Sequence, residues 1–205
     1  GWFSDPSIVA VTPLWIDGSK RIVDADIILN GRDHTFSTTG AAGAYHVQAV
    51  LTHEVGHFVG FDHSGTYAAT LFPYVSHRDF APRNLCGDDV AAARSLNPTG
   101  QTRIDGRVQR TGGAPISGAH VVAVHAGGAG LAGVLTRPDG TFSLVGLDPG
   151  PDVRLFVEPL DGGTTDDNLW RTVESDFQTT ERPGGAFSLG AGQVLDIGTV
   201  ACGAK

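Results

Sequence analysis

The sequence predicts an α+β protein of two domains, with a mixed first domain over residues 1–98 and an all-β antiparallel sandwich over residues 99–205. Three observations predict this division. The length of 205 residues exceeds the common single-domain size of about 100 to 150. The composition changes along the chain, because six of the eight histidines but only 9 of the 29 glycines precede residue 99. Residues 97–100, Asn-Pro-Thr-Gly, form a cluster of structure-breaking residues between the two parts.

The first domain carries its chemistry in residues 53–57, His-Glu-Val-Gly-His. On a helix, His53 and His57 lie one turn apart, so both imidazoles project from the same face and can share one metal ion. Glu54 lies beside them, where a carboxylate can take a proton from a water molecule activated by that metal. This short pattern also occurs by chance in unrelated helices, so it does not by itself establish a zinc site.

The residues that follow supply a third histidine. Gly60 allows the backbone to turn out of the helix, since glycine adopts left-handed dihedrals without steric cost. The turn brings His63 round as the third ligand. Three histidines within eleven residues of an otherwise apolar segment would be costly to bury without a metal or another partner. We therefore predict a zinc ion bound by His53, His57 and His63, with the fourth position open, which is typical of catalytic zinc.

With these residues in view, the chain resembles the metzincin metallopeptidases, whose zinc signature is HExxHxxGxxH, and Ser64 points to the matrixin branch. The resemblance implies that Leu71, within Ala-Thr-Leu-Phe-Pro-Tyr, occupies the place of the methionine in the Met-turn beneath the zinc. It also implies that Asp89 ties the family's closing helix, predicted over residues 88–96, to this turn. The alternative for Asp89 is a simple acidic first turn favoured by the helix dipole.

The resemblance further implies a substrate cleft. Residues 8–12 would form its edge strand, and residues 22–30 the inner neighbour of that strand. An extended peptide can dock on such an edge by adding a strand, while residues after the Met-turn line the pocket on the primed side. The residues expected to bind substrate are Ile8, Val9, Ala10, Val11, Pro73 and Tyr74.

Three departures from the family pattern shape these expectations. Leucine stands at position 71 and the chain has no methionine, a volume-conserving exchange that costs less than about 1.5 kcal/mol. Residues 22–30 lack the ligands for the structural zinc and calcium of animal matrixins, so one zinc ion is predicted. The family's first strands and first long helix are missing before Gly1. We therefore expect a domain that is incomplete at its N-terminus, and an N-terminal fragment or precursor segment that completes it.

The second domain is predicted from short runs rich in valine, isoleucine, phenylalanine and threonine between glycine, proline and aspartate turns. Such runs at close spacing are typical of an antiparallel β-sandwich. Asp139-Gly140 is a hairpin turn signal between two of them. The predicted strands are residues 102–108, 119–125, 133–136, 141–145, 153–158, 186–189 and 194–200.

The same region resembles the carboxypeptidase-regulatory or transthyretin-like sandwich found appended to secreted bacterial enzymes. The resemblance is carried by residues 104–108, 115–119, 139–144 and 146–150. Such a domain usually carries no chemistry, so His120 and His125 are interpreted as strand residues and not as ligands.

Charge and hydropathy exclude some partners. The net charge of −8 and the isoelectric point near 5.3 argue against nucleic acid or anionic membranes. No apolar run approaches the roughly 18 to 20 residues of a membrane span. Neither cysteine belongs to a CxxC pair, which excludes a thiolate zinc site. If the chain is secreted, oxidation favours a disulfide between Cys86 and Cys202; the alternative is two unpaired cysteines.

Together these features predict a secreted zinc-dependent endopeptidase that acts on polypeptides, with Glu54 as the general base. The alternative is a binding or assembly module in which the sandwich adheres to a surface and the zinc domain is weak or inactive. Leu71 and the missing upstream segment keep this alternative open.

Overall fold

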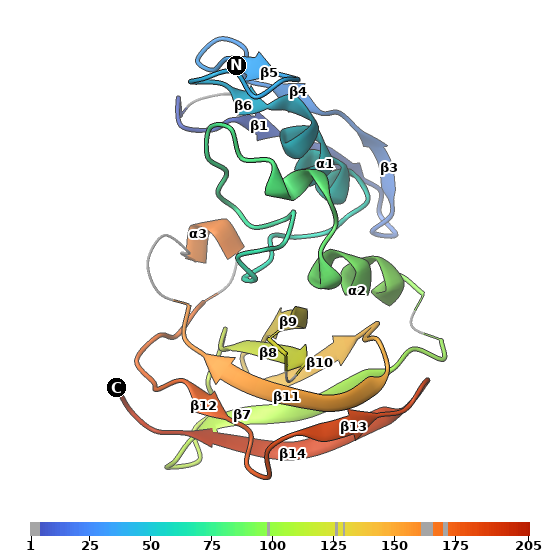
Figure 1. Cartoon of the computed structure of the whole chain (residues 1–205), viewed down its shortest axis with the longest axis vertical. Helices are drawn as coiled ribbons and strands as arrows, with labels where there is room; N and C mark the ends of the chain where they lie inside the picture. The colour runs from blue at the N-terminus through green and yellow to red at the C-terminus, as the bar shows by residue number, and fades with distance from the viewer. Residues whose placement is uncertain (1–4, 98, 126, 129, 161–165, 170–171) are drawn as a thin grey trace. The chain divides into compact units, whose positions relative to one another are not determined.

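The computed structural model describes residues 5–97, 99–125, 127–128, 130–160, 166–169 and 172–205. The chain is mixed in secondary structure, with mostly β content, and it divides into two compact units (Figure 1). The first unit contains the chain up to His63 and Thr70–Leu85. The second contains Ser64–Ala69 and Cys86–Lys205. A short segment of the second unit therefore interrupts the sequence of the first.

The described part of the first unit consists of short strands and two helices. In chain order these are β1 (Ala10–Val11), β2 (Leu14–Ile16), β3 (Ile22–Ala25), β4 (Ile28–Leu29), β5 (Phe36–Ser37), β6 (Tyr45–His46), α1 (Val47–Phe58) and the 3-10 helix η1 (Ala81–Arg83). Strands β5 and β6 pair in parallel, and α1 follows β6 directly.

Strand β1 pairs antiparallel with β4, and strand β2 pairs antiparallel with β3. One register continues across both pairs of strands, up to an irregularity beside Ile16. Pro13 lies at the interruption, where it cannot donate to the ladder because it has no N–H. Its carbonyl still accepts a hydrogen bond of 3.3 Å from Asp26. The predicted strands 8–12 and 22–30 are therefore neighbours, but the first is shorter than predicted and the second is divided in two.

Helix α1 is apolar on two faces. Ala49 and Val50 are buried within the first unit, as is the Glu54 side chain. On another face, Leu51 and Val55 are exposed, although both are large apolar residues. The buried face fixes the rotation of the helix and with it the direction of the histidines.

The described part of the second unit contains two helices and the strands of two sheets. In chain order these are α2 (Gly87–Ser95), β7 (Arg103–Arg110), β8 (His120–His125), β9 (Gly130–Leu135), β10 (Thr141–Val145), β11 (Gly150–Glu158), α3 (Asp166–Leu169), β12 (Thr180–Glu181), β13 (Phe187–Leu189) and β14 (Val194–Cys202).

The seven predicted strands correspond to β7, β8, β9, β10, β11, β13 and β14. One sheet has the order β10-β7-β14, and the other has β12-β11-β8-β9 with β13 also paired to β11 (Figure 1). Apolar side chains from both sheets form one core, among them Val108 from β7, Val121 from β8 and Val200 from β14.

Two details of the predicted sandwich were wrong. The sheets are not wholly antiparallel, because β14 pairs in parallel with β7. Strand β14 follows β13 of the other sheet, so no hairpin forces its direction against β7. The Asp139-Gly140 turn is formed, with φ of +79° at the glycine. It connects β9 and β10, which lie in different sheets, so it is not the turn of a hairpin. The reason is that β10 pairs with β7 while β9 pairs with β8.

Helix α2 was predicted over residues 88–96 as the closing helix of the first domain. In the structure it packs against β9 and β10 and belongs to the second unit. Gly87 allows this contact, because a Cβ atom there would lie 2.6 Å from the carbonyl oxygen of Gly130. The domain boundary after residue 98 stays a prediction.

Candidate metal centre

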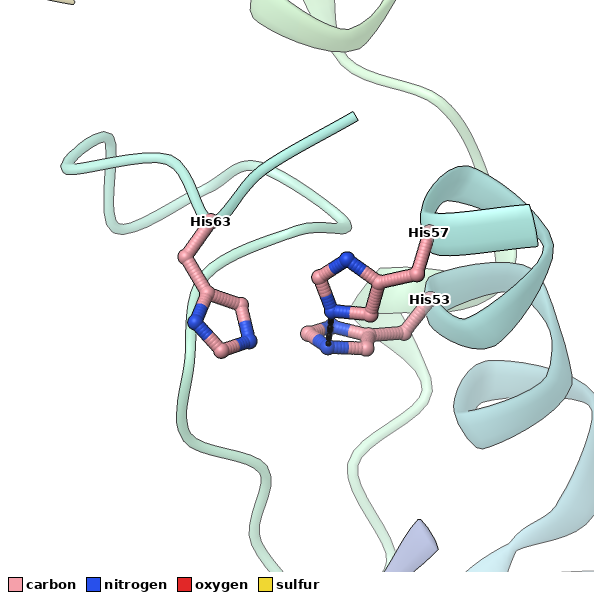
Figure 2. A group of neighbouring side chains, drawn as sticks. All are labelled: His53, His57 and His63. Atoms are coloured by element: carbon pink, nitrogen blue, oxygen red, sulfur yellow. Dashed lines mark hydrogen bonds between the residues drawn. The ribbon is translucent and has the colours of Figure 1, made fainter. Parts of the chain in front are cut away.

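Helix α1 brings two of the predicted ligands together. His53 and His57 lie one turn apart, and their Nε2 atoms approach to 3.0 Å (Figure 2). Their ring centroids are 4.7 Å apart and the ring planes are nearly perpendicular. Both side chains are half-buried. The helical spacing alone therefore places two imidazoles edge to edge on one face.

A glycine turn at the end of α1 brings in the third histidine. Gly60 has φ of +96°, and its N–H donates to the carbonyl of His57, while the N–H of Phe61 donates to that of Gly56. These two hydrogen bonds define a Schellman motif. The chain then reverses, and the His63 ring faces the two rings of α1, 4.7 Å from that of His57 between centroids (Figure 2).

Backbone carbonyls fix the orientation of both helical imidazoles. The Nδ1 atom of His53 lies 2.8 Å from the carbonyl oxygen of Thr70, and that of His57 lies 2.8 Å from the carbonyl oxygen of Phe61. A carbonyl only accepts, so each Nδ1 must carry the proton. Each Nε2 then presents its lone pair toward the same point, as in a pair of metal-binding imidazoles.

The three histidines fit a zinc ion in number and chemistry, and the His53 and His57 Nε2 atoms also fit it in spacing. Their ligand atoms all lie within 4.8 Å of one another, and they form the one such group of His, Cys, Asp or Glu found among the described residues. Ligands at about 2.0 to 2.1 Å from a tetrahedral zinc ion are themselves slightly more than 3 Å apart. Carbonyl partners on the distal ring nitrogens are also typical of metal-binding histidines.

Glu54 lies on the same helix but is held by a different partner. Its side chain is 5 % exposed, and Oε2 accepts a hydrogen bond of 2.5 Å from the Thr12 hydroxyl. Burial raises the pKa of the Glu54 carboxyl above its usual value, whereas the hydrogen bond from Thr12 acts in the opposite direction. A buried carboxylate with a raised pKa is suited to accept a proton.

Leu71, expected at the place of the Met-turn methionine, packs beneath α1. It is 5 % exposed, and a Cβ atom on Gly56 would lie 2.7 Å from its Cδ2. Gly56 lies between the two helical histidines in sequence, so Leu71 supports the turn of α1 that carries both of them. The preceding residue, Thr70, supplies the carbonyl that orients His53.

The residues expected to bind substrate lie in the first unit. Strand β1 contacts α1, and residues 8–11 are half-buried. Beyond Leu71, Pro73 is half-buried, and Tyr74 is 48 % exposed with its ring 5.9 Å from that of Phe72. Their role in peptide binding stays a prediction.

Asp89 and the two cysteines lie in the second unit. Oδ2 of Asp89 accepts a hydrogen bond of 2.8 Å from the N–H of Cys86, the residue before α2. The tie from Asp89 to the Met-turn stays a prediction. The predicted Cys86–Cys202 disulfide is not formed in this structure, where both cysteines are free. Cys202 is buried in the sandwich core on β14, whereas Cys86 immediately precedes α2, which packs on β9 and β10.

Sequence reasoning missed several groups that shape the site. The sequence places Thr12 in the predicted edge strand but indicates no role for it or for the carbonyls of Phe61 and Thr70. Carbonyl oxygens occur in every residue, so no sequence pattern marks the ones that orient a ligand. Thr12 lies 42 residues before Glu54, and only the folded chain brings the two together.

Comparisons with known proteins agree with these two parts. Residues 16–97 match the family model of the matrixins, and residues 103–167 match that of the carboxypeptidase regulatory-like domain. The predicted two-part resemblance is confirmed. A comparison with curated proteins finds no significant match to this chain. Among the described residues, no helix is long and apolar enough to cross a membrane.

Several solved structures share a distant likeness with half of the chain. The 5-hydroxyisourate hydrolase of Klebsiella pneumoniae is 19 % identical, with a TM-score of 0.32 over 50 % of this chain and 86 % of that one. BcpA, the major pilin subunit of Bacillus cereus, is 14 % identical, with a TM-score of 0.34 over 51 % and 30 %. GBS52, the minor pilin of Streptococcus agalactiae, is 12 % identical, with a TM-score of 0.33 over 51 % and 45 %.

Proposed function

We propose that this protein is a secreted zinc-dependent endopeptidase, with a catalytic domain over residues 1–98 and a sandwich domain over residues 99–205. The observation that carries the proposal is the convergence of His53, His57 and His63, with Glu54 on the same helix. The match of residues 16–97 to the matrixins supports the peptidase class.

Different residues of the chain carry out different steps of peptide hydrolysis. A zinc ion held by the three histidines would polarise the scissile carbonyl and lower the pKa of the attacking water. Glu54 takes the proton from this water and passes it to the leaving amine. Its raised pKa favours the first transfer. Residues 8–11 align the substrate backbone by strand addition, and Pro73 and Tyr74 contact its primed side.

We further propose that an additional N-terminal segment completes the catalytic domain. Helix α1 exposes Leu51, Val55 and Phe58, which follow one another at helical spacing on one face. Among the described residues, β4 pairs with β1 alone. A segment that packs on this helix face and pairs with the free side of β4 would bury the exposed side chains of α1 and the open edge of β4.

Metal analysis and peptide cleavage test the proposal together. The wild-type chain should bind one zinc ion and cleave a quenched peptide library, and a chelator should abolish cleavage. His57→Ala should lose zinc, whereas Glu54→Gln should keep zinc and lose cleavage. A His53/His57/His63 triple variant that still binds zinc stoichiometrically would refute the ligand assignment.

The same experiment separates the alternative function. A wild-type chain that binds zinc but cleaves no member of the library, with or without its N-terminal segment, would favour a binding or assembly module. The N-terminal segment is identified by intact mass and N-terminal sequencing of the native protein. Recovery of the protein from culture medium would test secretion.

A further inference from the structure

We infer that the side chain of Thr70 positions the metal ligand His53, because it closes the loop Thr70–Asn84, whose first carbonyl orients the His53 imidazole. The inference rests on the proposed function, since it concerns the same three-histidine site. All the residues involved belong to the first unit, which contains α1 and Thr70–Leu85. Thr70 is thereby a positioning residue and not a ligand.

Two groups of Thr70 connect different parts of the first unit. Its carbonyl oxygen lies 2.8 Å from Nδ1 of His53 on α1, and its hydroxyl donates a hydrogen bond of 3.4 Å to the carbonyl of Asn84. Thr70 is 3 % exposed, and a buried hydroxyl stays paired with a protein acceptor because water does not reach it. The hydroxyl therefore restricts the rotation of this residue, and with it the direction of the carbonyl that His53 faces.

The loop begins and ends against the helix that carries the ligand. Leu71, the second residue of the loop, is buried and packs beneath Gly56 on α1. Asn84 directly follows η1, which also packs against α1. The hydrogen bond from Thr70 to Asn84 thus joins two points that both lie beside α1. It limits how far the loop can move along the helix.

Aromatic rings hold the middle of the loop. The ring of Phe80 lies 5.0 Å from that of His46 between centroids, and the ring of His77 lies 4.5 Å from that of Tyr45. A Cβ atom on Gly40 would collide with the Phe80 ring, so the absence of a side chain there makes room for this contact. Strand β6, which supplies two of these rings, leads directly into α1. The loop is therefore tied to the start of the helix as well.

The carbonyl of Thr70 has the properties of a group that supports a metal ligand. It accepts from Nδ1 of His53, which leaves Nε2 as the nitrogen that would face a zinc ion. Partners outside the ligand set restrict the orientation of the ligands, and their loss commonly weakens metal binding about 10- to 100-fold. The Thr70 hydroxyl acts through this carbonyl, so we expect an effect at the lower end of that range.

Zinc affinity of the full chain tests this role. Thr70→Val replaces the hydroxyl with a methyl group, and it should weaken zinc binding about tenfold, as measured by competition with a chromophoric chelator. Thr70→Ser keeps the hydroxyl and should restore most of the affinity. The matched control is Thr52→Val, which removes a hydroxyl that donates to the Gln48 carbonyl within α1, at 2.7 Å, and not to the loop. It should bind zinc as the wild type does.

Spectroscopy separates positioning of His53 from a general loss of stability. In the cobalt(II)-substituted protein, Thr70→Val should alter the visible absorption band, because His53 is no longer held in one orientation. In the zinc-loaded protein, the Nδ1 proton of His53 should exchange with water faster in Thr70→Val than in the wild type, as measured by NMR. Thr52→Val should leave both signals unchanged. Thermal unfolding of the metal-free variants checks that the fold is intact.

Phe80→Leu keeps the test decisive if Thr70→Val does not fold. It removes the ring that packs on His46 and loosens the same loop, so it should also weaken zinc binding. Wild-type zinc affinity and an unchanged cobalt band in folded Thr70→Val would overturn the inference alone. The same result in folded Phe80→Leu would overturn it where Thr70→Val does not fold. A wild-type chain that binds no zinc would instead overturn the proposed function together with the inference.

Discussion

The hydroxyl of Thr12 lies 2.5 Å from Oε2 of Glu54 and donates a hydrogen bond to it. The Thr12 hydroxyl oxygen also lies 3.2 Å from the backbone carbonyl oxygen of Glu54. Thr12 follows β1, so this contact joins the strand expected to bind substrate to the helix that carries the metal ligands. It orients the carboxylate that we propose as the general base.

Replacement of Thr12 should therefore impair catalysis without removing the metal. A hydrogen bond to a charged group contributes about 1.5 to 3 kcal/mol, so Thr12→Val should lower kcat/KM at least about tenfold. Thr12→Ser keeps the hydroxyl and should retain most of the activity. Steady-state kinetics and zinc content of both variants check this. Equal activity in the valine and serine variants would show that the hydroxyl does not orient the base.

Replacement of Gly60 should disturb both the helix end and the third ligand. A side chain at φ of +96° is strained by about 1 to 2 kcal/mol, so Gly60→Ala should lower the free energy of unfolding by that amount. Zinc binding should weaken as well, because His63 follows three residues later. Gly31→Ala is the control, since a Cβ atom there meets nothing within 4 Å. Denaturant unfolding with and without zinc measures both effects, and equal values for the two variants would contradict the prediction.

Introduction of methionine at position 71 should change little. Leucine and methionine fill similar volumes, so Leu71→Met should alter the free energy of unfolding by less than about 1.5 kcal/mol. Zinc affinity should change only modestly, and peptide cleavage is expected to stay the same or rise. A large loss of thermal stability would mean that Leu71 does not lie in the turn beneath the metal.

Both cysteines should be free thiols of low reactivity. Burial raises the pKa of Cys86 to about 11 and also raises that of Cys202. Because the thiolate is the reactive form, alkylation of the folded protein at pH 8 should be much slower than that of the unfolded chain, and it should accelerate as the pH approaches 11. Thiol titration of the denatured, unreduced protein should find two thiols. A titration that finds fewer than two thiols would indicate a disulfide between Cys86 and Cys202.

The local features of the site followed from sequence because they depend on neighbours along the chain. A spacing of four residues places His53 and His57 on one face of any helix, and a glycine after the last turn suits left-handed dihedrals. The strands of the sandwich were predictable for the same reason, since alternating apolar residues between turns mark them one at a time.

Strand pairing could not be predicted in the same way. The partner of β14 depends on the path of the chain between the sheets, and a run of β-branched residues is the same whether it pairs in parallel or antiparallel. The division of residues 22–30 depends on Pro13, which lies opposite the break, between β1 and β2.

The sequence by itself determined which residues could bind a metal, because ligand type and helical spacing are properties of residues 53–63 alone. Only the tertiary structure decided what supports them. The Thr12–Glu54 hydrogen bond and the packing of Leu71 on Gly56 both join residues far apart in the chain. Such contacts form when elements pack, and they leave no periodicity or motif in the sequence.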